Sequence, residues 1–344
     1  MADSNLISIG ESSFQPGDKG EVDLPIGSLI DYQPVTMNVQ VRRSRRPGPS
    51  LLLTAGIHGD ELIGIEILRR VLKSSRLRSL RGTLIVVPVV NMPAFLARTR
   101  YLPDRRDLNR LFPGSPDGSL GGRLAATFVT EIVSQADFAI DFHTGAVGRP
   151  NLPQIRISPG DKGSLELAKA FKPPVVMETS LREGSLRSVY RSSGIPSLLF
   201  EGGEAYRCDS SSIRYGLRGV FATMEHLEML PTRRSRKEPR TKTVVASGTS
   251  WVRAPQGGIF TPHVTLGKAV SPATKLGILG DPFGRRETVV RSDLEGVVIG
   301  LNSEATADEG DALFHIATFA NPAKAEAHIQ RHDEVVEEHT DPLL

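Results

Sequence analysis

The sequence predicts a protein of the α/β class, in which a sheet covered by helices is followed by a small all-β domain. The length of 344 residues fits two domains, or one large domain with an appendage. Over the first 230 residues, short apolar runs alternate with helical patterns, and this alternation builds a sheet with helices on both faces. Beyond a basic stretch that contains two prolines, short strand patterns and glycine turns replace the helical period.

The predicted strands of the first domain are short apolar runs that turn-forming residues bound on both sides. They are residues 51–54, 83–90, 138–141 and 197–200. Between them, apolar residues recur every three or four positions, which is typical of amphipathic helices. These helical patterns span residues 62–72, 124–132 and 217–227. We therefore expect an α/β domain over residues 1–230.

The second half of the chain divides into a linker, a β domain and a tail. Residues 231–243 are basic, contain two prolines and are predicted to be the linker. Residues 244–320 are predicted to form the β domain, and residues 321–344 an acidic C-terminal tail.

The predicted β domain contains an internal repeat. Its two halves match at an offset of 38 residues, with Gly258-Ile259-Phe260 aligned on Gly296-Val297-Val298. A duplicated β unit favours a flattened barrel or sandwich, and this one resembles the biotinyl/lipoyl carrier fold. The hairpin over residues 280–286 lacks the lysine to which a carrier attaches its cofactor. The fold is therefore expected without the carrier chemistry.

Composition excludes several classes of protein. No apolar run approaches the roughly 20 residues that span a bilayer, and the first residues lack a signal-peptide pattern, so we expect a cytoplasmic protein without membrane contact. Cys208 is the single cysteine, which excludes an internal disulfide and a cysteine-built zinc site.

Two basic clusters, residues 42–46 and 233–242, lack interleaved aromatic side chains, so we expect no nucleic-acid partner. The first cluster could serve an anionic substrate or a subunit contact, which leaves a homo-oligomer open.

His58 and Glu61 lie three residues apart, just after the predicted strand at residues 51–54. Residues at this spacing on a helical turn point the same way, so both side chains could reach one ion. Imidazole nitrogen and carboxylate oxygen are suitable zinc ligands. By itself the spacing is weak evidence, because an acidic residue at a helix start is often explained by the helix dipole.

His143 strengthens the prediction of a metal site. It ends the predicted strand that includes Asp141, and the carboxyl ends of strands in an open α/β sheet gather at one edge. Two histidines and one glutamate leave a fourth zinc position open, as in catalytic sites. Asp141 could orient a ligand, or could only cap the strand.

Glu201 is the candidate general acid and base. It follows the apolar run at residues 197–200, and a carboxylate near a metal can take a proton from water and return it to a leaving amine. Glu204 is the alternative. The loop over residues 98–114 adds Arg100, Asn109 and Arg110, which could bind a substrate carboxylate or an oxyanion, or could form a solvated basic loop.

Four motifs together resemble the succinylglutamate desuccinylase/aspartoacylase family, which is related in fold to zinc carboxypeptidases. They are His-Gly-Asp-Glu at residues 58–61, Asp-Leu-Asn-Arg at 107–110, Asp-Phe-His-Thr-Gly at 141–145 and Glu-Gly-Gly at 201–203. The resemblance covers about residues 20 to 320. It implies a zinc carboxypeptidase-like mixed sheet flanked by helices, with the β domain covering the active site.

The resemblance also implies roles for individual residues. His58, Glu61 and His143 would bind one zinc ion per chain, and Glu201 would be the catalytic carboxylate. Arg100 would polarise the substrate carbonyl. Asn109 and Arg110 would contact the substrate, with Arg187 or Arg191 as a looser match.

The predicted reaction is hydrolysis of the amide bond in a small N-acyl amino acid, by water that the metal activates and Glu201 deprotonates. A zinc peptidase acting on peptides or cell-wall fragments is the nearest alternative, and assays on both kinds of substrate would separate the two. A non-catalytic metabolite-binding protein is the third hypothesis. The presence of all three ligands and the base argues against it.

Overall fold

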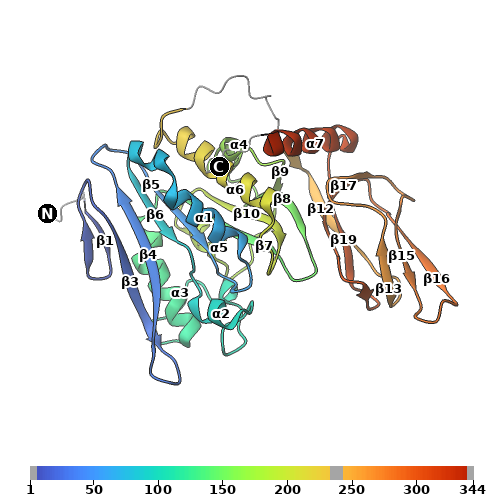
Figure 1. Cartoon of the computed structure of the whole chain (residues 1–344), viewed down its shortest axis with the longest axis horizontal. Coiled ribbons are helices and arrows are strands. Elements are labelled where there is room, and N and C mark those ends of the chain that lie inside the picture. The colour runs from blue at the N-terminus through green and yellow to red at the C-terminus, as the bar shows by residue number, and fades with distance from the viewer. Residues whose placement is uncertain (1–5, 233–242, 339–344) are drawn as a thin grey trace.

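A computed structural model describes residues 6–232 and 243–338. A sheet of 13 strands, here called the main sheet, runs through these residues from the hairpin at residues 19–43 to the C-terminal strands (Figure 1). Its main path has the order β12-β19-β17-β8-β10-β7-β5-β6-β4-β3, and β9, β11 and β14 pair beside this path. The expectation of an α/β protein with a mixed sheet is confirmed.

The centre of the main sheet is parallel. It consists of β5 (Ser50–Ala55), β6 (Thr83–Val87), β7 (Phe138–Gly145) and β10 (Ser197–Glu204). Every residue of β5 and β6 is buried, as is usual for parallel strands covered on both faces. These strands coincide with the four predicted apolar runs, but β7 and β10 continue further, so His143 and Glu201 lie inside strands.

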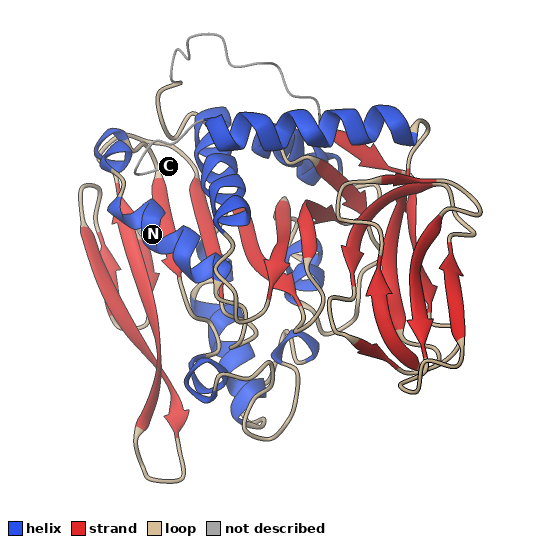
Figure 2. Ribbon diagram, turned by 45° about the vertical axis from the view of Figure 1, so that its right-hand side comes forward, coloured by secondary structure: helices blue, strands red, loops and turns tan. Residues whose placement is uncertain are grey.

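Helices cover both faces of the main sheet (Figure 2). They are α1 (Ile63–Lys73), α2 (Met92–Ala97), α3 (Leu120–Glu131), α4 (Lys162–Phe171), α5 (Leu186–Ser192) and α6 (Ser210–His226). Leu51 and Leu53 of β5 belong to one apolar cluster with α1, α4 and α6. Leu52 points the other way, into a cluster with α3 and α5. The alternation of side chains along a strand thus builds two cores.

Antiparallel strands on both sides of the parallel centre make the sheet mixed, and the sequence patterns above did not predict them. On the N-terminal side, β3 (Lys19–Ser28) pairs with β4 (Pro34–Arg43), whereas β1 (Ile7–Ile9) and β2 (Ser12–Phe14) form a separate two-stranded sheet. β4 pairs with β6. On the other side, β8 (Asn151–Ile157) lies antiparallel to β10 and beside β9 (Val175–Glu178).

The strands after residue 243 form two facing sheets. The main sheet includes β11 (Val244–Ala246), β12 (Gly248–Arg253), β14 (Ala269–Val270), β17 (Gly296–Leu301) and β19 (Ala312–Thr318). A second sheet holds β13 (Gly258–Pro262), β15 (Lys275–Gly280), β16 (Glu287–Arg291) and β18 (Thr306–Ala307). Side chains from both sheets, such as Phe260 and Phe314, form one apolar cluster.

The two predicted repeats fall in different sheets: β13 and β15 in the second sheet, β17 and β19 in the main sheet. This arrangement agrees with a duplicated unit, whereas the resemblance to a biotinyl/lipoyl carrier stays a prediction.

The predicted tail contains a helix, α7 (Pro322–Glu338), which packs against α6, β14 and β17. Most of the predicted linker, residues 233–242 with the second basic cluster, lies outside the described residues. The domain boundaries stay predictions. No described helix has both the length and the apolar character needed to cross a membrane.

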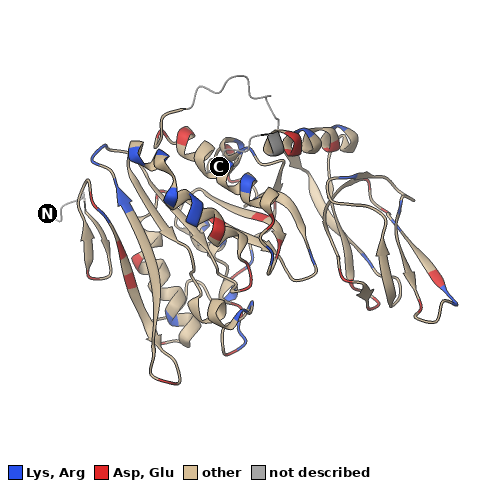
Figure 3. Ribbon diagram, viewed as in Figure 1, with Lys and Arg blue, Asp and Glu red and all other residues tan. Residues whose placement is uncertain are grey.

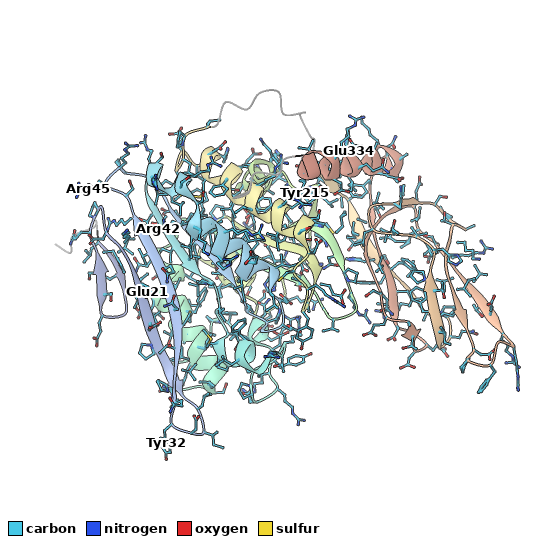
Figure 4. All side chains as sticks on the ribbon, in the orientation of Figure 1. Glu21, Tyr32, Arg42, Arg45, Tyr215 and Glu334 are labelled. Carbon is cyan, nitrogen blue, oxygen red and sulfur yellow. The ribbon has the colours of Figure 1, made fainter. Side chains whose placement is uncertain are left out.

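The first basic cluster has structural contacts. Arg42 donates a hydrogen bond of 2.6 Å to the carbonyl oxygen of Leu72, and Arg43 one of 2.6 Å to that of Phe14. Figure 4 shows Arg42 and Arg45 at the end of the β3–β4 hairpin opposite Tyr32. Both acidic and basic residues lie on α1 and α7 in Figure 3, as on ordinary solvated helices.

Candidate metal centre and active site

His58, Glu61 and His143 form a buried cluster. One potential ligand atom from each side chain lies within 4.8 Å of the other two. Nδ1 of His58 is 2.7 Å from Oε1 of Glu61, and Nδ1 of His143 is 2.9 Å from Oε2 of the same carboxylate. The structure therefore brings together the three residues that the sequence predicted as metal ligands.

The turn after β5 positions His58 and Glu61. The Glu61 amide donates to the His58 carbonyl oxygen, so both residues lie in a hydrogen-bonded turn that ends before α1, and not on the helix as predicted. A Cβ at Gly59 would come within 2.0 Å of the Ala94 carbonyl carbon, so only glycine allows this turn to pack against α2. Parallel pairing of Thr54 with Asp141 sets β7, and hence His143, beside this turn.

A carboxylate also faces the other ring nitrogen of each histidine. Nε2 of His58 is 3.1 Å from Oδ1 of Asp107, and Nε2 of His143 is 2.8 Å from Oδ2 of Asp141. The hydroxyl of Thr54 donates to the second oxygen of Asp141 at 2.7 Å. If Nε2 donates its proton to these carboxylates, the lone pair of each Nδ1 points at Glu61. For Asp141 the sequence left open whether it orients a ligand or only caps the strand, and no such role was predicted for Asp107.

The electrostatics of this cluster favour a cation. Burial by itself would raise the pKa of Glu61, but the charges of His58 and His143 lower it well below its ordinary value. Burial lowers the pKa of His58, yet Glu61 and Asp107 outweigh it and raise that pKa. The lone pairs of two Nδ1 atoms and the Glu61 carboxylate would repel one another in this buried cluster. They therefore need positive charge between them, from protons or from a metal ion. Two imidazoles and one carboxylate fit zinc with an open position.

Arg100 lies beside the cluster. Its Nη1 is 3.2 Å from Oε1 of Glu61, and its Nη2 is 3.2 Å from Oδ2 of Asp107. The guanidinium is thus held between a candidate ligand and the carboxylate that faces His58. This position would allow it to reach a substrate oxygen next to the metal.

Asn109 and Arg110 occupy the short 3₁₀ helix Leu108–Arg110. Asn109 is buried, and its Oδ1 accepts a hydrogen bond of 2.9 Å from the Leu186 amide at the start of α5. Arg110 is exposed and donates to the Asn109 carbonyl oxygen at 2.5 Å. Asn109 therefore anchors α5 through its oxygen, and its Nδ2 and the Arg110 guanidinium are the groups that could contact a substrate.

Glu201 lies next to His143 on the main sheet. The two residues pair in register between β10 and β7, so both side chains lie on one face. Nδ2 of Asn151 donates to Oε2 of Glu201 at 2.9 Å, and Nη1 of Arg156 is 3.3 Å from Oε1. Glu204, the alternative base, instead accepts a hydrogen bond of 2.7 Å from the Gly148 amide. The position of Glu201 suits an acid and base better than that of Glu204.

Residues that the sequence analysis missed surround Glu201. Asn151, Gln154 and Arg156 come from β8, where polar and apolar side chains alternate after residue 153. His315 of β19 stacks on Trp251 of β12, with ring centroids 4.5 Å apart. Alternation on β8 was a usable signal for one buried face, but the sequence did not show that this face adjoins Glu201.

The main sheet brings His315 close to these β8 residues. Gly300 of β17 pairs with both Asn151 and His315. Burial, and then the charge of Arg156, lower the pKa of His315 to about 3. His315 lies in β19, which β17 connects to the β8 face beside Glu201.

Of the two loosely matched arginines, Arg187 lies near the site and Arg191 does not face it. Arg191, near the C-terminal end of α5, pairs with Asp161 at 3.3 Å. Arg187 donates to the Thr179 hydroxyl at 2.6 Å and to the Ser180 carbonyl oxygen at 2.7 Å. Burial and the neighbouring Arg156 lower its pKa to about 10.

The single cysteine of the chain, Cys208, is exposed.

Comparison with known proteins gives a consistent picture. Residues 47–227, more than half of the chain, match the sequence profile of the succinylglutamate desuccinylase/aspartoacylase catalytic domain. The Nα-acetyl-L-2,4-diaminobutyric acid deacetylase of Halomonas elongata is 28% identical over 284 residues, which cover 79% of this chain and 83% of the relative. A succinylglutamate desuccinylase of Pseudomonas syringae is 26% identical over 249 residues, covering 68% and 70%.

Solved structures of two similar proteins have the same fold as this chain. The product-bound ectoine utilization protein of Ruegeria pomeroyi superposes with a TM-score of 0.80 at 25% identity, covering 92% of this chain and 100% of that protein. A succinylglutamate desuccinylase/aspartoacylase from Rhodobacter sphaeroides superposes with a TM-score of 0.77 at 26% identity, covering 87% and 95%.

Proposed function

Because the chain belongs to the succinylglutamate desuccinylase/aspartoacylase family, we propose that it is a zinc-dependent hydrolase that cleaves the amide bond of a small N-acyl amino acid. The observation that carries this proposal is the buried cluster of His58, Glu61 and His143, together with Glu201, which lies opposite His143 on the neighbouring strand β10. Deacylating enzymes among the relatives support the reaction class.

In this proposal, His58, Glu61 and His143 hold the zinc ion. When bound there, zinc would acidify water and polarise a carbonyl oxygen. The carboxylates of Asp107 and Asp141 keep the two imidazole rings oriented and their Nδ1 atoms unprotonated toward the ion.

Arg100 and Glu201 carry out the remaining steps. Arg100 donates a hydrogen bond to the acyl oxygen and stabilises the negative charge that grows there as water attacks. Glu201 takes a proton from the attacking water and passes it to the leaving nitrogen when the amide bond breaks. Asn151 and Arg156 hold the Glu201 side chain for both transfers. Asn109 and Arg110 contact the substrate from the 3₁₀ helix Leu108–Arg110.

The substrate we propose is an amino acid whose amine carries a small acyl group. The relative from Halomonas elongata acts on an acetylated diamino acid, and several other relatives are named for the removal of a succinyl group. Acetyl and succinyl derivatives of amino acids are therefore the first compounds to test.

A panel of substrates tests this function. Purified protein should release amine from acetylated or succinylated amino acids, lose this activity with a chelator, and regain it when zinc is added back. Peptides serve as the comparison, because a peptidase would prefer them. Turnover that resists chelation, or turnover of peptides alone, would contradict the proposal.

A further inference from the structure

The row of side chains across the main sheet continues past the active-site carboxylate. His143, Glu201 and Gln154 lie opposite one another on β7, β10 and β8. Neighbouring strands are about 4.8 Å apart, so Gln154 lies beside Glu201 on the side away from His143. Under the proposed function, the substrate carbonyl lies by the metal ligands and the leaving nitrogen by Glu201. The amine half of the substrate then extends over β8.

Buried polar atoms without partners converge at this place. Gln154 is fully buried, and among the described residues neither its Oε1 nor its Nε2 has a hydrogen-bond partner. Within the same part of the chain, Nε of Arg156 and Nδ1 of His315 are also buried and unpaired. Unpaired buried polar atoms are unfavourable unless a ligand or water satisfies them. Gln154 and Arg156 lie beside Glu201, and His315 is close enough to Arg156 for the charge of Arg156 to lower its pKa, so these unpaired atoms indicate a position for a polar ligand.

The charge of this place favours an anion. Arg156 and Arg187 are close enough for the charge of Arg156 to lower the pKa of Arg187, and Glu201 is the carboxylate that opposes this effect. Arg187 donates to Ile157, Thr179 and Ser180, so its hydrogen-bonding capacity is largely used. The guanidinium of Arg156 pairs only with Glu201 among the described residues, and its side chain is 27% exposed. Arg156 can therefore bind a carboxylate that enters from solvent.

We propose that Arg156, Gln154 and His315 form the subsite for the amine half of the substrate. Arg156 pairs with a free carboxylate, Oε1 of Gln154 accepts a hydrogen bond from the amide N–H, and His315 closes the subsite from β19. This inference rests on the proposed function and names its substrate class. The substrate is an N-acyl amino acid with a free carboxylate, rather than an N-acyl amine or amide.

The experiment compares an N-acyl amino acid with its carboxamide on three proteins. For the wild type, kcat/KM should be higher with the acid than with the carboxamide. In Arg156→Gln this preference should fall about 10- to 100-fold, the effect of one charge-assisted pair. The matched control is Arg253→Gln, since Arg253 is exposed and donates to the Gly310 carbonyl oxygen, and it should retain the preference.

Two outcomes would overturn the inference. If Arg156→Gln lowers kcat equally on acid and carboxamide, Arg156 serves only to position Glu201. If Arg110→Gln removes the preference while Arg156→Gln keeps it, the carboxylate binds at the 3₁₀ helix that contains Arg110. A second variant, Gln154→Glu, keeps the side-chain size and adds a negative charge, so it should reduce turnover of the acid more than that of the carboxamide.

Binding of the product separates this inference from the proposed function. Calorimetry should show that the wild type binds the free amino acid more tightly than its carboxamide, and that Arg156→Gln does not discriminate. This measurement needs no turnover. A wild type that hydrolyses no N-acyl compound but shows this discrimination contradicts the reaction and supports the subsite. Hydrolysis without discrimination supports the reaction and contradicts the subsite.

Discussion

At the scale of single residues, Glu61 is the centre of the proposed metal site, because its two oxygens face different histidines. The charges of the two histidines hold the pKa of this carboxylate well below the ordinary range, so it stays ionised. Catalysis is assigned to a separate carboxylate. The same residue type thus serves two roles because the neighbours differ.

Replacement of Glu201 by glutamine tests this separation. Glutamine keeps the side-chain size but cannot carry the proton, so we expect activity to fall by about two to four orders of magnitude. The zinc content, measured by atomic absorption, should remain that of the wild type, since Glu201 is not one of the clustered ligands. Near-normal turnover would reject the assigned role.

Asp107 connects a proposed ligand to the proposed electrophilic arginine, because one oxygen faces His58 and the other faces Arg100. In Asp107→Asn both partners lose a charged acceptor. Zinc affinity, measured by competition with a chromogenic chelator, should fall about 10- to 100-fold. Asp104→Asn is the control in the same loop, as Asp104 pairs with Arg106 at 3.6 Å on the surface. Equal affinities in the two variants would contradict the connecting role.

At the scale of elements, α1 carries a carboxylate with two basic partners. Glu66 accepts from Arg69 at 2.6 Å and from Arg70 at 2.7 Å. The hydrogen bond from Arg69, and then that from Arg70, outweigh partial burial and lower the pKa of Glu66 from 4.5 to about 2. The folded state therefore binds this proton more weakly than the unfolded state. The stabilisation is complete above pH 4.5 and is lost as the pH falls toward the folded pKa.

Glu66→Gln should therefore lower the free energy of unfolding by about 0.5–1 kcal/mol near neutral pH, a value reduced for the exposure of the arginines. The difference from wild type should shrink as the pH falls below 4.5 toward the folded pKa of Glu66. Urea unfolding at several pH values measures it. Glu166→Gln on α4 is the control with a single lysine partner, and should have a smaller effect. A difference that grows on acidification would contradict the assignment.

At the scale of the whole molecule, the main sheet passes from the α/β part into the C-terminal strands beside Glu201. Gly300 pairs with Asn151 across this junction, and a Cβ at Gly300 would come within 2.9 Å of Asn151 Oδ1. The Asn151 side chain could move to make room for this Cβ, but it would then move away from Glu201. We therefore expect the packing of the C-terminal strands to act on the proposed active site through the Asn151 side chain.

Gly300→Ala should lower kcat about tenfold, the effect of one lost hydrogen bond to Glu201, the proposed catalytic carboxylate, and leave the zinc content unchanged. Steady-state kinetics and metal analysis measure both. Gly248→Ala is the control, because nothing lies within 4 Å of a Cβ at that position of β12. Unchanged kinetics in Gly300→Ala would show that Asn151 does not act on Glu201.

Local patterns in the sequence determined the parallel centre of the sheet, three of its helices and the chemistry of the metal cluster. The four apolar runs became β5, β6, β7 and β10, because their side chains favour burial on both faces whatever surrounds them. The strand β4 was missed although its buried residues alternate, at positions 35, 37, 39 and 41. That signal was present in the sequence and was overlooked.

Only the tertiary structure decided what lies beside Glu201. The antiparallel return of β8 next to β10, and the approach of β19 through β17, bring Gln154, Arg156 and His315 together. Strand order depends on which apolar faces find one another over the whole molecule, and no local spacing encodes it. Local sequence patterns therefore predicted the type of chemistry, and the order of strands in the sheet decided which side chains lie beside Glu201.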